Sequence, residues 1–464
     1  MESRAHENRA RVLPPVTRMV LGALFFCFLT GLIAAAASLP FLFESASMLY
    51  KSGSEKIMLR SGKVVGMIGA CLLMLQLVWS ARIRWLDRVF ALNNLYSIHA
   101  VSGTFTACLL VIHPVLILQS DDMLFIPLQL RYWPEFAGLF LLLVVVGMAA
   151  AARLRTVLGL SFNLWWVMHR LAAAVLPVLL FIHVVFVSET FESGLPRQLV
   201  FWAIAAYLLL YAWVKTRIFR IRSKPFVITA VKQAGEGAYS VRMQPEKPPA
   251  QRRLHSTHPD YLPGQFGFLT INSPHISGEE HPFTIASSPS TPGSLEFVIR
   301  TGGDWTAKIS RVRQGDRAFV DGPYGLFTHL RVSAASELIM IAGGIGITPM
   351  LSMLRYMRDT NDTRRTTLIW SNRTRNHIIR PDEISSLESS LDGLKIFHVI
   401  TAEDGGSRET GRLDRARLED LLSDCGFQAA VFVCGPPAMM TDMAEALAAM
   451  GYSRRLIFTE RFSL

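Results

Sequence analysis

Six apolar stretches in the first half of this 464-residue chain constrain its fold more than any other feature. A helix that crosses a bilayer needs about 20 consecutive apolar residues. Each stretch is near that length and, apart from Arg170 in the fifth, contains no Asp, Glu, Lys or Arg. The stretches are Met19–Leu39, Val64–Ala81, Leu92–Gln119, Phe136–Ala152, Trp165–Ser188 and Gln198–Val214. The sequence therefore predicts a transmembrane domain of six helices over residues 19–217, after a short N-terminus of residues 1–18.

Lys and Arg are distributed unevenly around these stretches. With the N-terminus inside, the inner segments hold 14 Lys and Arg residues and the outer loops hold six. Basic residues concentrate on the cytoplasmic side of membrane proteins. We therefore expect both termini in the cytosol and the chain in the cell inner (plasma) membrane. The formal net charge of +11 would also suit nucleic acid, but this topology accounts for most of it, and no nucleic-acid partner is predicted.

Composition excludes several other classes of protein. Charged residues make up 18% of the chain and the mean hydropathy is +0.32. A soluble domain carries about 25% charged residues, so part of this chain is expected to lie in lipid. The five cysteines are scattered and form no CxxC motif. This spacing argues against a disulfide framework and against a zinc site.

The second half of the chain has a different pattern. Short β-type runs separated by turns over residues 225–330 predict an antiparallel β-barrel domain. Over residues 335–464, apolar strands alternate with helices, which predicts an α/β domain with a parallel sheet. The expected fold is thus multi-domain, with a six-helix transmembrane bundle, a β-barrel and an α/β domain. The polar, Pro-rich segment Ser240–Pro263 is expected to be a loop.

Four histidines lie at matched positions in two of the apolar stretches. The third stretch contains His99 and His113, and the fifth contains His169 and His183. Both gaps are 14 residues, which places the two histidines of a helix about 40° apart and about 21 Å along its axis. Both helices run from inside to outside. They can therefore lie side by side, with His99 level with His169 and His113 level with His183.

Two facing imidazoles at one level can take the two axial positions of a haem iron. The spacing thus predicts two b-type haems, an inner one at His99 and His169 and an outer one at His113 and His183. A single membrane histidine is more often part of hydrogen-bonded packing, but the matched pairs favour haem. A metal or proton pathway would usually need carboxylates, and the six stretches contain none. Arg170 either holds a haem propionate or is an interfacial arginine whose head reaches the lipid headgroups.

Motifs of the barrel region suit a flavin. The run His281-Pro282-Phe283-Thr284 offers an aromatic surface and a hydroxyl of the kind that a flavin ring needs. The run Arg300–Thr306 adds glycines and a helix start where a pyrophosphate can dock. Asp321–Gly325 is expected to be a tight turn that closes this unit.

A glycine-rich turn in the α/β region suits a nucleotide. Ala342–Pro349 follows an apolar strand and opens a helix, with Thr348 expected as the N-cap and Pro349 at the first helical position. The next strand ends at Trp370-Ser371-Asn372-Arg373, without the acidic residue that binds a ribose 2′-hydroxyl. Arg373, with Arg375 beside it, is therefore predicted to bind a 2′-phosphate, which favours NADPH. The alternative is an exposed loop arginine.

One further motif completes the set. Cys434-Gly435-Pro436-Pro437 ends another strand, where a loop could cover a nicotinamide, although Cys434 alone would more often be a buried structural thiol. With these motifs in this order, the chain resembles the ferric reductase/NADPH oxidase superfamily, and its bacterial members in particular, over about residues 15–464. The resemblance implies a six-span bis-haem domain fused to a ferredoxin-reductase-like module. It also implies FAD, NADPH and two b-type haems as cofactors.

The resemblance assigns roles to matching residues. FAD is expected at His281, Pro282, Phe283 and Thr284, and its phosphates at Gly302, Gly303, Trp305 and Thr306. NADPH is expected at Gly343, Gly344, Gly346, Thr348 and Pro349, with Cys434, Gly435 and Pro436 near the nicotinamide. Phe462 is expected to stack on the flavin, although two residues follow it here. Catalysis is expected to rest on positioning, with Thr284 near the flavin and Cys434 near the nicotinamide, rather than on an acid or a base.

The implied activity is electron transfer from cytosolic NADPH through FAD, the inner haem and the outer haem to an acceptor outside. The outer loops, about residues 40–63, 120–135 and 189–197, contain no His and no Cys. This favours dioxygen as the acceptor and superoxide as the product. A ferric-chelate reductase of the same architecture and an electron-donor subunit for a periplasmic protein remain alternatives. No protein partner is identified by the sequence.

Overall fold

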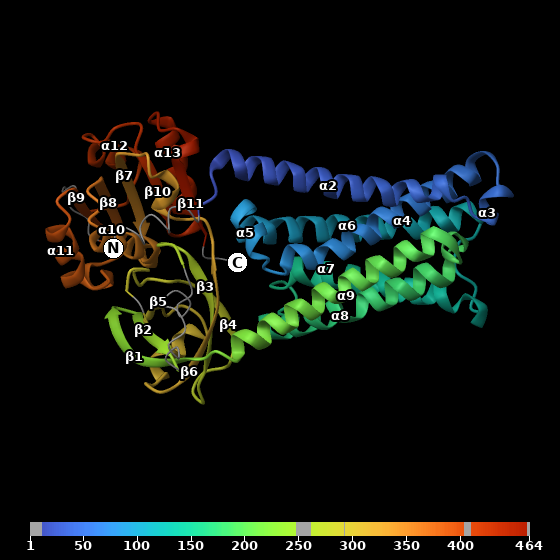
Figure 1. The fold of residues 1–464 in the computed structure, drawn as a ribbon, viewed down its shortest axis with the longest axis horizontal. Helices are drawn as coiled ribbons and strands as arrows, with labels where there is room; N and C mark the ends of the chain where they lie inside the picture. The colour runs from blue at the N-terminus through green and yellow to red at the C-terminus, as the bar shows by residue number, and fades with distance from the viewer. Residues whose placement is uncertain (1–11, 247–260, 292, 403–409, 462–464) are drawn as a thin grey trace, which may run out of the picture. The chain divides into compact units, whose positions relative to one another are not determined.

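The computed structural model describes residues 12–246, 261–291, 293–402 and 410–461 (Figure 1). These residues form two compact units. One is Val16–Arg217, and the other combines Ile218–Leu464 with the residues that precede Val16.

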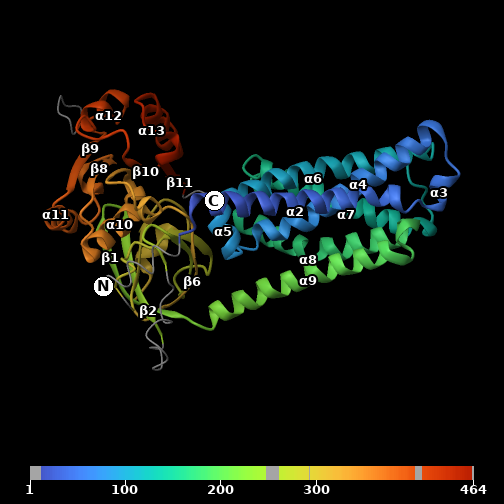
Figure 2. The same cartoon turned by 45° about the horizontal axis from the view of Figure 1, so that its top comes forward.

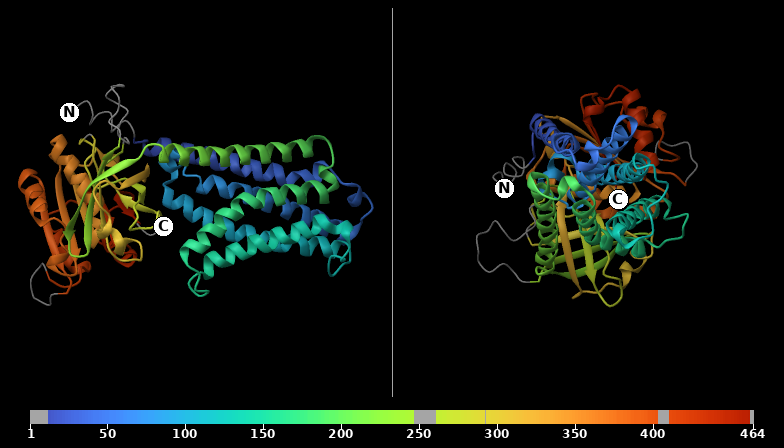
Figure 3. Two further views of the ribbon diagram at one scale, coloured as in Figure 1. Left: turned by 90° about the horizontal axis from the view of Figure 1, so that it is seen from below. Right: turned by 90° about the vertical axis from the view of Figure 1, so that its right-hand side faces the viewer.

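The first unit contains six helices that are long and apolar enough to cross a membrane, counted over the described residues. They run lengthwise as one bundle (Figures 2 and 3). Their bounds are α2 (Pro15–Leu42), α4 (Gly53–Ser80), α6 (Leu92–Ser120), α7 (Trp133–Leu154), α8 (Phe162–Val187) and α9 (Gly194–Arg222). The prediction of six spanning helices is confirmed.

Two of these helices extend further than their apolar stretches. Helix α4 begins at Gly53 rather than Val64, and α9 ends at Arg222 rather than Val214. The added turns carry Lys and Arg, which favour helix as much as apolar residues do and can lie outside the hydrocarbon. The connections contain the short elements α3 (Ala46–Leu49), α5 (Arg84–Phe90), η1 (Leu130–Tyr132) and η2 (Glu189–Phe191).

The outside of the bundle is strongly apolar. Phe105 is 56% exposed and Trp202 is 74% exposed, and many Leu, Val and Phe side chains share this exposure. Apolar surface of this extent is unfavourable in water and suits contact with lipid chains. Inside the bundle, helices α6, α7 and α8 form a small apolar cluster of Ala107, Leu110, Leu141, Val145 and Leu180.

The second unit begins with a six-stranded antiparallel sheet. Its strands are β1 (Phe226–Gly235), β2 (Ala238–Pro245), β3 (Phe266–Asn272), β4 (Glu280–Thr284), β5 (Leu295–Arg300) and β6 (Arg317–Tyr324), in the order β4-β3-β6-β1-β2-β5. A bridge from Ile285 to Phe297 joins the two edge strands and closes the sheet. The predicted antiparallel barrel is confirmed. The 3₁₀ turns η3 (Thr306–Arg311) and η4 (His329–Val332) flank β6.

Two local predictions in this barrel are wrong. The segment predicted as a loop from Ser240 starts inside β2, because Ser240–Pro245 pairs with β1 and Ser240–Met243 also pairs with β5. The segment Asp321–Gly325 is not a free turn, since Asp321–Tyr324 belongs to β6 and pairs with β3 across an irregularity near Phe266. In both cases strand pairing overrides the local preference of Pro and Gly for turns.

A five-stranded parallel sheet follows. Its strands are β7 (Glu337–Gly343), β8 (Arg365–Asn372), β9 (Leu394–Ile400), β10 (Ala430–Cys434) and β11 (Ile457–Glu460), in the order β11-β10-β7-β8-β9. The helices are α10 (Ile347–Thr360), α11 (Pro381–Ser390), α12 (Arg415–Leu421) and α13 (Pro437–Ala449), and the 3₁₀ turns are η5 (Gly344–Gly346), η6 (Arg375–His377) and η7 (Arg454–Leu456).

Both faces of this sheet are buried. Alternate residues of β7 face opposite ways, with Leu338 and Met340 packing toward α10 and α11 and with Ile339 and Ile341 packing toward α12 and α13 (Figure 1). A strand that is covered on both faces is apolar at consecutive positions, as ELIMIAG is here. The predicted α/β domain is confirmed.

Candidate functional site

The bundle brings the four histidines together in two pairs. The ring centroids of His99 and His169 lie 5.8 Å apart, and those of His113 and His183 lie 6.3 Å apart. His99 and His113 come from α6, and the other two come from α8. The planes within each pair are nearly perpendicular, at 78° and 85°.

Backbone carbonyls of neighbouring helices orient three of the four rings. The Nδ1 atom of His99 lies 3.2 Å from the Gln76 carbonyl oxygen, and that of His113 lies 2.8 Å from the Gly62 carbonyl oxygen. His183 Nδ1 lies 3.3 Å from the Pro134 carbonyl oxygen. A carbonyl only accepts, so these contacts fix the Nδ1–H tautomer and leave Nε2 as the nitrogen that can bind a metal.

Glycines make room for the outer pair. A Cβ atom added to Gly66 of α4 would lie 2.7 Å from His113 Nδ1, and one added to Gly138 of α7 would lie 2.3 Å from His183 Nδ1. Both distances are far below van der Waals contact. The sequence analysis did not identify these glycines, although the spacing Gly62-x-x-x-Gly66 is a known pattern for close helix packing.

These features fit a haem at each level. With metal–nitrogen bonds of about 2 Å on both sides, two axial imidazoles have ring centroids roughly 6 Å apart. Nowhere in the described part of the chain do three His, Cys, Asp or Glu side chains gather as a metal site. Two imidazoles without a carboxylate suit haem iron better than a closed zinc or calcium site.

His169 is held differently from the other three histidines. Its Nδ1 atom is buried without a hydrogen-bond partner, and its ring stacks on Trp165 and Trp166 at centroid distances of 5.2 and 6.5 Å. The Arg170 guanidinium lies over the Trp166 ring, 5.9 Å from its centroid. The propionate role of Arg170 stays a prediction.

In the barrel, the flavin motif forms strand β4. Thr284 ends this strand and is 4% exposed, and its hydroxyl oxygen is buried without a hydrogen-bond partner. A buried hydroxyl that lacks a partner is costly, and a ligand atom at this position would satisfy it. The hydroxyl therefore fits the predicted flavin contact.

The other residues of the motif form an aromatic cluster. The His281 ring lies 4.5 Å from the Trp305 ring, and Phe283 stacks on Trp305 at 5.9 Å. The Trp305 indole N–H donates to the Ser277 carbonyl at 2.8 Å. Pro282 lies between these side chains in β4 and pairs with β3.

The predicted phosphate turn is ordered by its own side chain. The backbone N–H groups of Gly302 and Gly303 each donate to the Thr306 hydroxyl at 3.0 Å. The following segment is the 3₁₀ turn η3 rather than an α-helix. The exposed glycine amides point to one hydroxyl oxygen, which is the type of polar group that a phosphate oxygen could replace.

The glycine-rich turn differs from its prediction in one respect. Helix α10 begins at Ile347, with Gly346 as its N-cap residue, so Thr348 is not the N-cap and Pro349 is the third helical residue. The 3₁₀ turn Gly344–Gly346 begins the helical segment earlier than the sequence predicts. The Thr348 hydroxyl donates to the Ile345 carbonyl at 3.1 Å instead.

Parallel pairing of β7 with β10 places this turn against the Cys434–Pro437 loop. A Cβ atom on Gly343 would lie 2.8 Å from Pro436 Cδ, and one on Gly346 would lie 2.2 Å from the Cys434 carbonyl oxygen. A Cβ atom on Gly435 would lie 3.1 Å from the Gly343 backbone. The glycines thus serve packing between two motifs as well as ligand approach.

Cys434 is fully buried in β10. Its thiol donates to the Glu460 carbonyl oxygen at 3.5 Å. Burial, and next the charge of Glu460, raise the pKa of the Cys434 thiol well above its ordinary value. The side chain is therefore a neutral thiol at physiological pH, and a role beside the nicotinamide would be one of shape.

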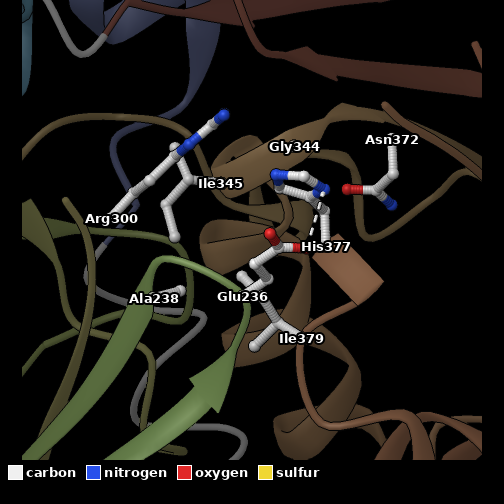
Figure 4. Close-up of a pocket in the computed structure, with 8 residues that line it drawn as sticks. All are labelled: Glu236, Ala238, Arg300, Gly344, Ile345, Asn372, His377 and Ile379. Carbon is white, nitrogen blue, oxygen red and sulfur yellow. Dashed lines mark ion pairs between the residues drawn. The ribbon is translucent and has the colours of Figure 1, made fainter. Parts of the chain in front are cut away.

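A cleft lies between the barrel and the α/β domain (Figure 4). Its lining residues are Glu236, Ala238, Arg300, Gly344, Ile345, Asn372, His377 and Ile379. Asn372 is 3% exposed, and both polar atoms of its side chain lack hydrogen-bond partners. His377 Nδ1 lies 3.9 Å from Glu236 Oε2, the contact drawn dashed in Figure 4.

Sequence reasoning missed Glu236 and His377, because a hairpin turn and a 3₁₀ turn bring these residues together from distant positions. Arg300 ends β5, and its Nη1 would lie 3.1 Å from a Cβ on Gly344. Arg373 follows β8 and is exposed. Its 2′-phosphate role stays a prediction. Phe462 lies outside the described residues.

Comparisons with known proteins agree with this geometry. Residues 65–180 match the family "Ferric reductase like transmembrane component". Residues 240–328 match "FAD-binding domain", and residues 340–445 match "Oxidoreductase NAD-binding domain".

Individual relatives match part of the chain. The propane 2-monooxygenase reductase component of Rhodococcus jostii is 30% identical over 51% of this chain and 62% of its own length. The glycine betaine monooxygenase reductase subunit of Pseudomonas aeruginosa is 30% identical over 44% of this chain and 56% of its own. The chain thus spans about six tenths of these relatives. A cytochrome P450 reductase structure from Amycolatopsis covers 52% of this chain and 69% of its own, with a TM-score of 0.44 and 20% identity.

These matches and the six spanning helices describe a multi-pass membrane protein with FAD-binding and NAD-binding oxidoreductase domains. The chain therefore joins a ferric reductase-like transmembrane component to FAD-binding and NAD-binding oxidoreductase domains, which matches the architecture expected for the ferric reductase/NADPH oxidase superfamily.

Proposed function

We propose that this protein is a transmembrane NADPH oxidase, which moves electrons from cytosolic NADPH through FAD and two b-type haems to dioxygen outside and produces superoxide. The observation that carries the proposal is the geometry of the two histidine pairs. Their ring centroids lie 5.8 and 6.3 Å apart, and both pairs join the same two helices. The matches to FAD-binding and NAD-binding domains support binding of the reductant by the second unit.

The cofactors supply the redox chemistry when bound, because FAD exchanges either one or two electrons, whereas NADPH gives two at once and haem iron takes one. The residues of this chain supply binding and position. Thr284 offers a hydroxyl to the flavin, and Gly343 and Gly346 form the turn at the nucleotide. Catalysis by positioning needs no acid or base from the protein.

The bundle separates the two imidazole pairs along its length. Fourteen residues of α6 correspond to about 21 Å, which is most of a hydrocarbon core of about 30 Å. The apolar cluster of Ala107, Leu110, Leu141, Val145 and Leu180 belongs to this stretch of the bundle. Such packing excludes water between the two levels. We propose cytosolic termini in the inner membrane from the excess of Lys and Arg on that side.

Dioxygen is proposed as the acceptor from the chemistry of the outer connections. Three basic side chains there are paired with carboxylates, namely Lys51 with Asp121 at 2.9 Å, and Lys56 and Arg60 with Glu44. The outer loops contain no His and no Cys to bind iron. A small neutral acceptor needs neither a cationic site nor ligands.

Two observations favour other acceptors. The matched transmembrane family is described as ferric reductase like, which supports a ferric chelate. The relatives named above are a reductase component and a reductase subunit, which supports transfer to a partner protein.

One set of assays separates these functions. Purified full-length protein with NADPH in air should reduce cytochrome c in a reaction that superoxide dismutase stops. Faster NADPH oxidation with ferric citrate under anaerobic conditions would instead identify a ferric reductase. Negligible turnover with both acceptors, together with full haem reduction by NADPH, would identify a donor to another protein. Absence of two b-type haems would end the proposal.

A further inference from the structure

A buried ionic cluster joins the barrel to the α/β domain. We call it the junction cluster, and its members are Ser240 and Glu296 of the barrel and Arg355, Arg380 and Glu383 of the α/β domain. Glu296 is 4% exposed and Arg355 is 6% exposed. Arg355 Nη1 donates to Glu296 at 2.8 Å. Ser240 and Arg380 also donate to Glu296.

The cluster is balanced in charge. Arg355 donates through Nε and Nη2 to the two oxygens of Glu383 at 2.7 and 2.8 Å, so that it bridges two carboxylates. Arg380 binds the same two carboxylates and reaches Glu383 at 3.1 Å. Arg242, which is largely exposed, adds a longer contact of 3.4 Å to Glu296. A buried and a half-buried carboxylate, Glu296 and Glu383, therefore face a buried and a half-buried guanidinium group, Arg355 and Arg380.

Helix α10 connects this cluster to both binding motifs. Arg355 Nη1 donates to the Ala286 carbonyl at 2.8 Å, and the Ser352 hydroxyl donates to the Ser287 carbonyl at 2.8 Å. Ala286 and Ser287 lie two and three residues after Thr284 in the chain. The first turn of α10 continues from the glycine-rich turn. One helix thus ties the flavin-binding strand to the nucleotide-binding turn within about two helical turns.

Stability alone does not explain such a cluster. Buried ion pairs contribute little net stability compared with apolar residues of the same volume, because both ions lose their hydration. They do fix geometry, since each guanidinium bond has a defined direction. Hydride transfer from NADPH to FAD, which leaves NADP⁺ and reduced flavin, is sensitive to displacements of about 1 Å.

We propose that Arg355 is a positioning residue for this hydride transfer, which it aids by fixing the flavin-binding strand relative to the nucleotide-binding turn through Glu296 and Ala286. The inference rests on the proposed function, because it takes NADPH-to-flavin transfer as the reaction. It adds a role for residues that lie in neither binding motif.

The test uses full-length protein in detergent, with FAD, mixed with NADPH in an anaerobic stopped-flow instrument. Arg355→Met should slow flavin bleaching about 10- to 100-fold, with flavin content and the apparent Kd for NADPH within twofold of wild type. NADPH deuterated at the transferred position should give a larger isotope effect in the variant. Arg412→Met, which removes an exposed pair with Asp442, should change neither quantity.

A purely structural role gives a different result. Flavin content would then fall, while the bleaching rate per bound flavin would equal that of wild type, and this outcome would overturn the proposal. Where Arg355→Met does not fold, Ser352→Ala decides, because it removes one bond from α10 to Ser287 and leaves the ions in place. It should slow bleaching several-fold, and a wild-type rate would overturn the proposal. Failure of wild-type protein to bleach would refute the proposed function instead.

Discussion

The two units of this protein use buried polar groups in opposite ways. In the bundle, the polar side chains with matched geometry are four imidazoles, and three of them are oriented only by backbone carbonyls. In the second unit, which contains the barrel and the α/β domain, charged side chains form a network of hydrogen bonds among Glu296, Arg355 and Arg380. The bundle is surrounded by lipid, where water is absent, whereas water is available to the second unit. A polar group in lipid is therefore retained for a function, whereas one in an aqueous domain is as often a structural connection.

The strongest test of this comparison removes one imidazole. His99→Ala or His169→Ala should abolish the inner haem and stop electron flow to the acceptor, while NADPH still reduces the flavin. The reason is that one of the two imidazoles that would bind the iron is lost. Haem content from the reduced pyridine spectrum and stopped-flow flavin bleaching measure the two effects.

The control is a histidine of the aqueous unit. His275→Ala, at an exposed turn of the barrel, should alter neither haem content nor turnover. Full haem content in both bundle variants would show that the imidazoles are packing residues.

A smaller change tests the space around the outer pair. Gly138→Ala should reduce the haem content from two per chain toward one, because the new Cβ would lie 2.3 Å from His183 Nδ1. Gly147→Ala in the same helix meets nothing within 4 Å and should keep both haems. Equal haem content in the two variants would mean that the ring can move without cost.

Much of this architecture could be predicted from local patterns. The six helices follow from apolar length, and the β-barrel and parallel sheet follow from runs such as LEFVIR and ELIMIAG. The histidine pairs follow from equal spacing on parallel helices. In each case one element carries its own signal, because side-chain period and backbone geometry are coupled.

Other features depend on tertiary contacts and leave no local signal. The carbonyls of Gly62 and Gln76 are backbone atoms, which any residue would supply. The cleft residues Glu236 and His377 meet only after the two domains pack. Thr348 was predicted as an N-cap because Ser and Thr favour that position, but the Gly344–Gly346 turn moves the helix start.

The preference for NADPH over NADH tests the role of Arg373, an exposed residue of the second unit. Arg373→Ala should raise the KM for NADPH by about tenfold or more, because a charged hydrogen bond contributes about 1.5–3 kcal/mol, and should leave the KM for NADH unchanged. Steady-state rates with both nucleotides measure the ratio. Similar changes for the two nucleotides would remove the 2′-phosphate role from Arg373.

Acid pH provides the mildest test, and the carboxylates of the junction cluster are among the groups on which it acts. Burial opposes ionisation of Glu296 and Glu383, but the charge of Arg355, with that of Arg380, outweighs it, and the pKa of each carboxyl is lower than the ordinary value of 4.5. A lowered folded pKa stabilises the fold above the unfolded value, and this stability is lost as the pH falls through the folded pKa. The thermal midpoint of flavin release should therefore decrease as the pH falls below about 5.

Glu296→Gln should weaken this pH dependence and lower the midpoint at pH 7 by several degrees, since 1 kcal/mol corresponds to about 2–4 °C in a domain of this size. The exposed pair of Glu419 with Arg415 provides the matched control, because Glu419→Gln should leave the curve unchanged. The Tyr261 hydroxyl lies 2.9 Å from that of Ser287. Burial raises the pKa of Tyr261, so this side chain stays neutral throughout this range. The carboxyls of the cluster are then the groups that gain protons in this transition, and an unchanged curve in Glu296→Gln would place the transition elsewhere in the chain.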